Sequence, residues 1–267
     1  MIIDFHVHFF PDSLAQKAMD HLSTKSGVKP YGEGTFGSLA DFMKESHIDL
    51  AVNQPVATSP EQVISINRKM IESNKNSFST GIISFGAMHP DFARIGSIKD
   101  ELSFIASNGI KGIKLHCEYQ DFYPDEDKLL PVYESCSENG LTVLFHSGRD
   151  IGFTSLHATP ERLFEVSRIS GLHIVLAHMG GYRLWDDVEK YLVGYKNIYL
   201  DTAFTVEMSD NQMKEIINCH GAGNILFGSD FPWESPERVR GKIKALGLGP
   251  ESENLIFHKN AEILLDL

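Results

Sequence analysis

Short apolar runs alternate along the chain with longer stretches in which apolar residues recur at helical spacing. Eight of the short runs have the length of buried strands, and each is followed by a stretch that predicts a helix. The expected strands cover residues 2–10, 48–56, 79–88, 109–117, 141–148, 173–181, 197–204 and 224–233. Strands that alternate with helices in this way predict a parallel sheet of the α/β class.

The expected helices lie between these strands and after the last of them, at 12–22, 38–46, 59–73, 95–108, 129–139, 159–170, 185–195, 209–220, 235–247 and 253–267. Eight such units in 267 residues fit a (β/α)8 TIM barrel. An open, doubly wound sheet is the alternative, but no GxGxxG motif follows an early strand. We therefore expect a single domain over residues 1–267, in which residues 11–37 form an insertion at the rim of the barrel.

The overall charge narrows the choice of partners. The chain has 24 Lys plus Arg against 36 Asp plus Glu, a net charge of −12, which repels phosphate backbones and anionic lipid. We expect a small-molecule substrate, no nucleic acid and no membrane, and a homo-oligomer is compatible with the sequence. The three cysteines lack CxxC spacing, which argues against a disulfide framework and favours a reducing, cytoplasmic setting.

The first expected strand carries two histidines in the run IIDFHVHFF. Successive side chains on a strand point to opposite sides, so His6 and His8 are expected on one face, with Phe5 and Val7 on the other. Such a pair can bind one ion, although a histidine in an apolar strand is often a hydrogen-bonded core residue. The residues at the ends of the other strands are needed to distinguish a metal site from a hydrogen-bonded core.

Polar residues also stand where other expected strands end, at the end of a barrel that carries active sites. They are Lys114 and His116 on the fourth strand, His146 at the end of the fifth, His178 at the end of the sixth and Asp230 at the end of the eighth. One barrel mouth brings all of these strand ends together. Nitrogen and oxygen donors without a thiolate suit Zn²⁺ first, with Mn²⁺ or Fe²⁺ as alternatives, and a metal-free hydrogen-bond network is the competing interpretation.

The motifs DFHVH, GIKLH, LTVLFHSG, IVLAHMGG, ILFGSDFPW and KNAEILLDL, taken in order, resemble the amidohydrolase superfamily, and within it amidohydrolase family 2. The resemblance covers nearly the whole chain. It implies a TIM barrel with one divalent metal ion held by His6, His8, His146 and Asp230. It also implies that His178 lies beside the reacting group and acts in catalysis together with Asp230.

Four further residues are candidate substrate ligands. Lys114 and His116 lie on the fourth strand; binuclear relatives carry a carboxylated lysine there that bridges two ions, whereas we expect one metal and a pairing role for Lys114. Arg149 and Arg183 lie in the loops after His146 and His178. A guanidinium in such a loop can bind a substrate carboxylate through two parallel hydrogen bonds, and a surface salt bridge is the alternative for both.

Three functions fit these residues. The first is a metal-dependent hydrolase that activates water to cleave an amide, lactone or similar bond of a small, carboxylated molecule, with Asp230 moving the proton and His178 stabilising the developing charge. The alternative is a metal-dependent, non-oxidative decarboxylase of a small aromatic or unsaturated acid, in which Asp230 or its bound water protonates the carbon. The third is a catalytically silent, metal-binding barrel. Sequence spacing does not separate hydrolysis from decarboxylation, and we place hydrolysis first.

Overall fold

The computed structural model describes residues 1–267, apart from the side chain of Phe78. The strands are β1 (Ile3–Val7), β2 (Leu50–Asn53), β3 (Ile82–Ser84), β4 (Gly86–Ala87), β5 (Gly112–Leu115), β6 (Thr142–Phe145), β7 (Ile174–Leu176), β8 (Ile198–Asp201) and β9 (Ile225–Leu226). The α-helices are α1 (Asp12–Ser26), α2 (Phe36–Ser46), α3 (Gln62–Asn74), α4 (Ser77–Thr80), α5 (Ile98–Ser107), α6 (Cys117–Gln120), α7 (Leu130–Glu138), α8 (Pro160–Ser167), α9 (Trp185–Tyr191), α10 (Asp210–His220), α11 (Pro236–Ala245), α12 (Pro250–Asn254) and α13 (Asn260–Leu265).

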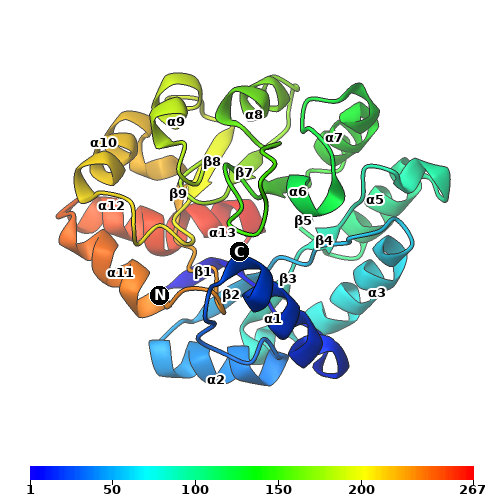
Figure 1. Ribbon diagram of the computed structural model, residues 1–267, viewed down its shortest axis with the longest axis horizontal. Helices are drawn as coiled ribbons and strands as arrows, with labels where there is room; N and C mark the ends of the chain where they lie inside the picture. The colour runs from blue at the N-terminus through cyan, green and yellow to red at the C-terminus, as the bar shows by residue number, and fades with distance from the viewer.

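The strands follow one another around a ring in chain order, with most of the helices outside it (Figure 1). Each strand pairs in parallel with the next, and β3 and β4 are two parts of one expected strand that is interrupted at Phe85. At the seam of the ring, the Phe5 amide donates to the Phe227 carbonyl at 2.8 Å, and the Asp230 amide donates to the His6 carbonyl at 2.8 Å. The first and last strands therefore lie side by side, and the expected TIM barrel is confirmed.

The centre of the ring is filled by an apolar cluster to which strands on all sides contribute. Its buried members on the strands or beside them are Ile3, Phe5, Val52, Phe85, Leu144, Val175, Ala177, Tyr199 and Leu226. A larger cluster contains residues of the helices and the outward-facing residues of the strands. The interior is thus a packed core, so substrates can reach only the end of the barrel.

The strict alternation expected along the first strand is broken in β1. The register of β1 against β2 shifts between Asp4 and Val7. Phe5 belongs to the central cluster, whereas Val7, two residues later, belongs to the outer one. An irregularity of this kind bends a strand and changes the direction of neighbouring side chains, and this one spans Phe5 and His6.

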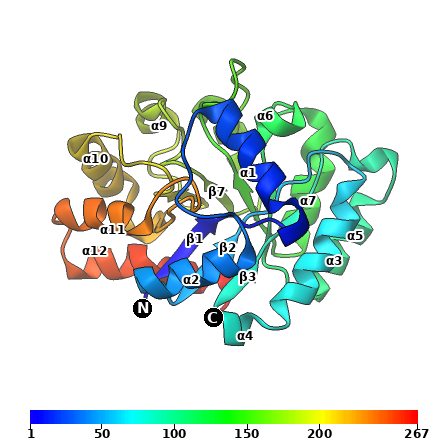
Figure 2. The ribbon, with the colours of Figure 1, turned by 60° about the horizontal axis from the view of Figure 1, so that its bottom comes forward.

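The segment expected as a rim insertion, residues 11–37, contains α1. This helix lies at the end of the barrel opposite both chain termini (Figure 2). α1 ends at Ser26, and the next residue, Gly27, has a φ of 72°, the left-handed conformation that glycine adopts readily after a helix C-terminus. α2 begins at Phe36, two residues before the expected start, because the Thr35 hydroxyl accepts a hydrogen bond from the amide of Ser38.

Two expectations from composition can be compared with the structure. Cys117, Cys136 and Cys219 are free thiols, the first two buried and the third exposed. Among the described residues, the structure contains no helix with the length and apolar character that crossing a membrane requires.

Candidate metal centre and active site

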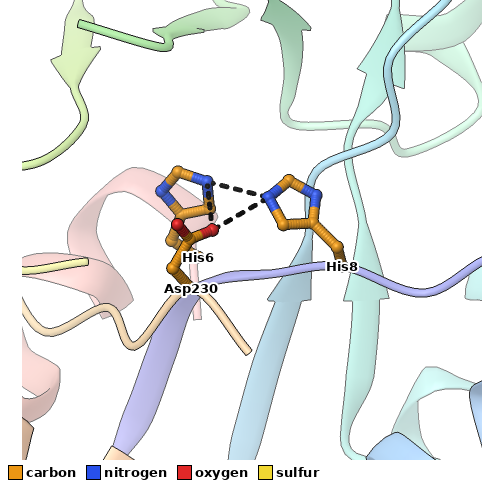
Figure 3. Close-up of side chains that lie close together, drawn as sticks. All are labelled: His6, His8 and Asp230. Atoms are coloured by element: carbon orange, nitrogen blue, oxygen red, sulfur yellow. Dashed lines mark hydrogen bonds and ion pairs between the residues drawn. The ribbon is translucent and has the colours of Figure 1, made fainter. Parts of the chain in front are cut away.

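His6, His8 and Asp230 converge on one point at the end of the barrel (Figure 3). His8 Nε2 lies 3.1 Å from Asp230 Oδ1, and His6 Nε2 lies 3.6 Å from the same oxygen. The two Nε2 atoms are 3.2 Å apart. The position of Asp230 beside the first-strand histidines was expected from barrel closure, and the structure has it there.

In each histidine, the hydrogen-bond partner of Nδ1 determines which ring nitrogen carries the proton. His8 Nδ1 lies 2.9 Å from the carbonyl oxygen of Gln54, which can only accept, so Nδ1 is the protonated nitrogen. His6 Nδ1 lies 2.7 Å from Asp201 Oδ2, and a carboxylate oxygen again makes Nδ1 the donor. Burial lowers the pKa of His6 well below its ordinary range, so this ring is neutral.

Both Nε2 atoms therefore carry lone pairs, and both face an oxygen of Asp230. Three electron-pair donors within 3.6 Å of one another repel unless a cation lies among them. The Lys114 ammonium, 3.2 Å from His6 Nε2, relieves part of this repulsion on one side, and burial lowers its pKa to about 8. Two imidazoles and one carboxylate are a donor set that suits Zn²⁺ or a similar divalent ion, so these residues fit a metal.

A second group of metal-type side chains, His116, His146 and Asp150, lies beside the first. The rings of His116 and His146 are stacked, with centroids 4.3 Å apart and planes inclined by 10°. An imidazole binds a metal in the plane of its ring, and one ion cannot lie in two parallel planes. His116 Nε2 instead lies 3.2 Å from Asp150 Oδ2. Burial raises the pKa of Asp150, but the hydrogen bond and charge of His116 and the hydrogen bond from the Gly152 amide together lower it by more, so the pKa lies below its ordinary value.

His146, predicted as a metal ligand, has conflicting contacts in this arrangement. Its Nδ1 lies 3.0 Å from His178 Nε2, and its Nε2 lies 3.3 Å from the carbonyl oxygen of Arg149. His178 Nδ1 donates to the Ala203 carbonyl at 2.9 Å, so His178 Nε2 carries a lone pair. Burial keeps the pKa of His146 well below its usual range, and a neutral ring has one proton for two acceptors. Its role as a ligand stays a prediction.

Two carboxylates that sequence reasoning did not single out hold the site in place. Asp201, at the end of β8, accepts hydrogen bonds from His6 Nδ1, from the amide of His178 at 2.9 Å and from the amide of Ala203 at 3.0 Å. Asp4 accepts from the amide of Ser229 at 2.9 Å and so ties β1 to the residue before Asp230. Burial raises the pKa of each carboxyl to about 7, so Asp201 is the carboxylate that accepts from His6 Nδ1 above this pH. Each was marked in the sequence only by being an acid in an apolar run.

The four candidate substrate ligands lie in different surroundings. Lys114, His116 and Arg149 line one cavity of about 790 Å³ together with the metal-type residues, and α1 forms part of its wall. Tyr182, Phe204 and Trp233 supply aromatic surface to the same cavity. Arg183 is 54% exposed, and its Nε donates to Glu207 Oε1 at 3.0 Å, so its guanidinium already has a carboxylate partner.

Residues 3–267 match the family model described as amidohydrolase. The chain belongs to this family. No curated protein matches the sequence. Solved amidohydrolase-type barrels that it resembles include 5-carboxyvanillate decarboxylase from Sphingomonas paucimobilis, at 15% identity over 100% of this chain and 99% of that one with a TM-score of 0.72.

Two further structures show the same likeness to this amidohydrolase. 2,6-Dihydroxybenzoate decarboxylase from Rhizobium is 15% identical over 99% of this chain and 98% of its own, with a TM-score of 0.69. A 5-carboxyvanillate decarboxylase from Novosphingobium aromaticivorans, described with bound manganese, is 14% identical over 100% and 97%, with a TM-score of 0.71. At these identities the likeness carries the fold and not the reaction.

Proposed function

We propose that this amidohydrolase is a metal-dependent, non-oxidative decarboxylase of a small aromatic or unsaturated carboxylic acid. This order reverses the one favoured from the sequence, in which hydrolysis came first. The related structures described as 5-carboxyvanillate and 2,6-dihydroxybenzoate decarboxylases support the change, and the bound manganese of one of them supports a divalent ion. For the ion itself we propose zinc, with manganese or iron as alternatives.

The state of His178 is the observation that carries the choice between the two reactions. Hydrolysis, as first considered, requires His178 to stabilise negative charge on the attacked carbonyl oxygen, which calls for a hydrogen-bond donor. The single proton of the neutral ring is on Nδ1 and points to the Ala203 carbonyl, and burial lowers the pKa of His178 to about 4. Nε2 therefore accepts rather than donates. Loss of carbon dioxide creates charge on carbon and does not need this donor.

In the proposed reaction, His6, His8 and Asp230 would hold the divalent ion, which would supply a Lewis acid for the anionic oxygens of the substrate. Aromatic side chains of the cavity, among them Tyr182, Phe204 and Trp233, pack against the substrate. The bond between the carbon and its carboxylate breaks, carbon dioxide leaves, and the electron pair stays on the carbon. Asp230 transfers a proton to that carbon and takes up another from solvent.

The test uses metal-loaded enzyme with a panel of 2-hydroxybenzoic acids, in parallel with lactones and amides of similar size. We expect release of carbon dioxide that stops on chelation, and in D2O a product with one deuterium at the carbon that lost its carboxylate. Metal-dependent cleavage of lactones or amides without carbon dioxide would reject the proposal in favour of hydrolysis. Metal binding with no turnover of any compound would favour a silent barrel.

Elemental analysis of protein purified without chelator is expected to give one equivalent of a divalent metal, because one set of lone pairs converges on one point. Two equivalents, with Lys114 carboxylated, would replace the one-metal site by a binuclear one. Mass spectrometry of the intact chain distinguishes these results, because carboxylation adds the mass of carbon dioxide to the lysine.

A further inference from the structure

The cavity carries more positive charge than the rest of this acidic chain. Of its described lining residues, Asp150 and Asp230 are the only carboxylates, and each lies within 3.2 Å of a histidine nitrogen. Lys25, Lys69 and Arg149 line the same cavity, and all three are exposed. In the part of the chain that the structure describes, none of these three cations has a carboxylate oxygen within 4.0 Å.

Lys25 is held in place by aromatic rings instead of by an acid. Its Nζ lies 3.3 Å from the ring centroid of Phe153 and 4.7 Å from that of Tyr119. The two rings meet edge to face with centroids 4.8 Å apart. Such a cation–π contact positions an ammonium group without neutralising its charge, so the group stays able to bind an anion.

This ammonium lies beside the loop after β6, on the side of the barrel mouth away from the strand that carries His6 and His8. Phe153 belongs to the loop after β6, which is the fifth strand of the ring when β3 and β4 are counted as one. The fifth strand of an eight-stranded barrel lies opposite the first, and the first carries His6. Arg149 belongs to the same loop as Phe153, so α1 and this loop together place two cations without a carboxylate partner on the side of the cavity opposite His6 and His8.

We propose that the substrate carries a second carboxylate, at the far end of the molecule from the reacting one, and that Lys25 and Arg149 bind it over the ring of Phe153. This inference rests on the proposed function for the identity of the reacting end. It adds that the enzyme selects diacids over otherwise matched monoacids. The apolar middle of the substrate would then span the cavity between two anion-binding ends.

Binding of benzoate and of benzene-1,4-dicarboxylate to the metal-loaded enzyme tests the proposal by calorimetry, without any turnover. We expect the diacid to bind about fivefold more tightly, the upper range for a solvent-accessible ion pair. Lys25→Gln should remove this preference, and Lys25→Arg, which keeps the charge, should retain it. Lys17→Gln is the matched control, since Lys17 is an exposed residue of the same helix that lies outside the cavity lining.

Equal affinity of the wild type for the two acids would overturn the proposal. So would an equal loss of preference in the Lys17 and Lys25 variants, because the general field of the helix would then explain it. The result is separable from the proposed reaction. A diacid preference with no release of carbon dioxide from any acid would reject decarboxylation and leave the subsite, whereas turnover without the preference would reject the subsite alone.

Discussion

Asp201→Asn tests whether the hydrogen bond between Asp201 and His6 Nδ1 determines which nitrogen of His6 is free to bind a metal. The amide oxygen of Asn can keep the hydrogen bonds from the His178 and Ala203 amides. Its NH2 group then replaces Oδ2 at 2.7 Å from His6 Nδ1, where two donors would face each other. His6 is expected to move its proton to Nε2, the atom that faces His8 and Asp230. The lone pair available to a metal is lost, although no metal-facing side chain has changed.

The expected effect is a loss of metal affinity of about 10- to 100-fold, the usual range for removing a carboxylate behind a metal-binding histidine. This corresponds to about 1.4 to 2.7 kcal/mol. Zinc titration against a competing chelator measures the affinity, and 15N chemical shifts of the His6 ring report which nitrogen carries the proton. Both readings should change together, because one proton shift causes both.

Thr202→Val is the matched control, one residue further along the chain. It removes two buried hydrogen bonds of 3.0 Å with Gly228, one to its carbonyl and one from its amide, and should lower the free energy of unfolding by about 2 kcal/mol without changing metal affinity. Wild-type affinity in the Asp201 variant would refute the argument about the tautomer. Equal weakening in the control would show that general loosening of β8, and not the proton of His6, is responsible.

Three other predictions follow from the geometry. Asp230→Asn should keep substantial metal, since an amide oxygen can coordinate, yet lose nearly all turnover, since it cannot supply a proton; near-normal release of carbon dioxide would require another acid. Gly148→Ala should lower the free energy of unfolding, measured with denaturant, by about 2 kcal/mol or more, because φ is 82° and a Cβ would lie 2.2 Å from the Tyr182 amide nitrogen. Gly140→Ala, where φ is also positive but a Cβ would have no atom within 4 Å, should lower it by only about 1 kcal/mol. His220 is buried, which lowers its pKa below 6.5, and its neutral ring bonds two backbone groups. The unfolded chain therefore binds this proton first, stability falls as the pH drops through 6.5, and His220→Gln should flatten this fall in urea melts between neutral pH and about pH 5.

The fold and the position of Asp230 beside His6 and His8 can be predicted from patterns along the sequence. Apolar runs of strand length followed by helical periodicity are enough to predict the barrel. Closure of the ring then places Asp230 next to His6 and His8, because the first and last strands are neighbours. The shift in β1 was missed because strict alternation assumes an unbroken register, and nothing in IIDFHVHFF marks the place where it breaks.

The hydrogen-bond and ion-pair partners of individual side chains cannot be predicted from such patterns. Arg149 and Arg183 occupy equivalent loops after two histidines, yet only Arg183 finds a carboxylate, Glu207, on a neighbouring loop. Asp201 lies within the run NIYLDTAF and is the last residue of β8, and an acid at a strand end was a usable signal. Its bond to His6 depends on the relative position of strands far apart in the sequence, which no local pattern contains.

The division of the three convergent ligands between the two ends of the chain has a consequence for biosynthesis. His6 and His8 are synthesised before the rest of the ring, whereas Asp230 follows only after all eight strands have been made. A nascent or truncated chain can therefore hold two of these donors but never the set. Tight metal binding is therefore possible only once the ring is complete. Because the ion binds the complete barrel more tightly than shorter or partly open chains, it stabilises the complete barrel relative to them.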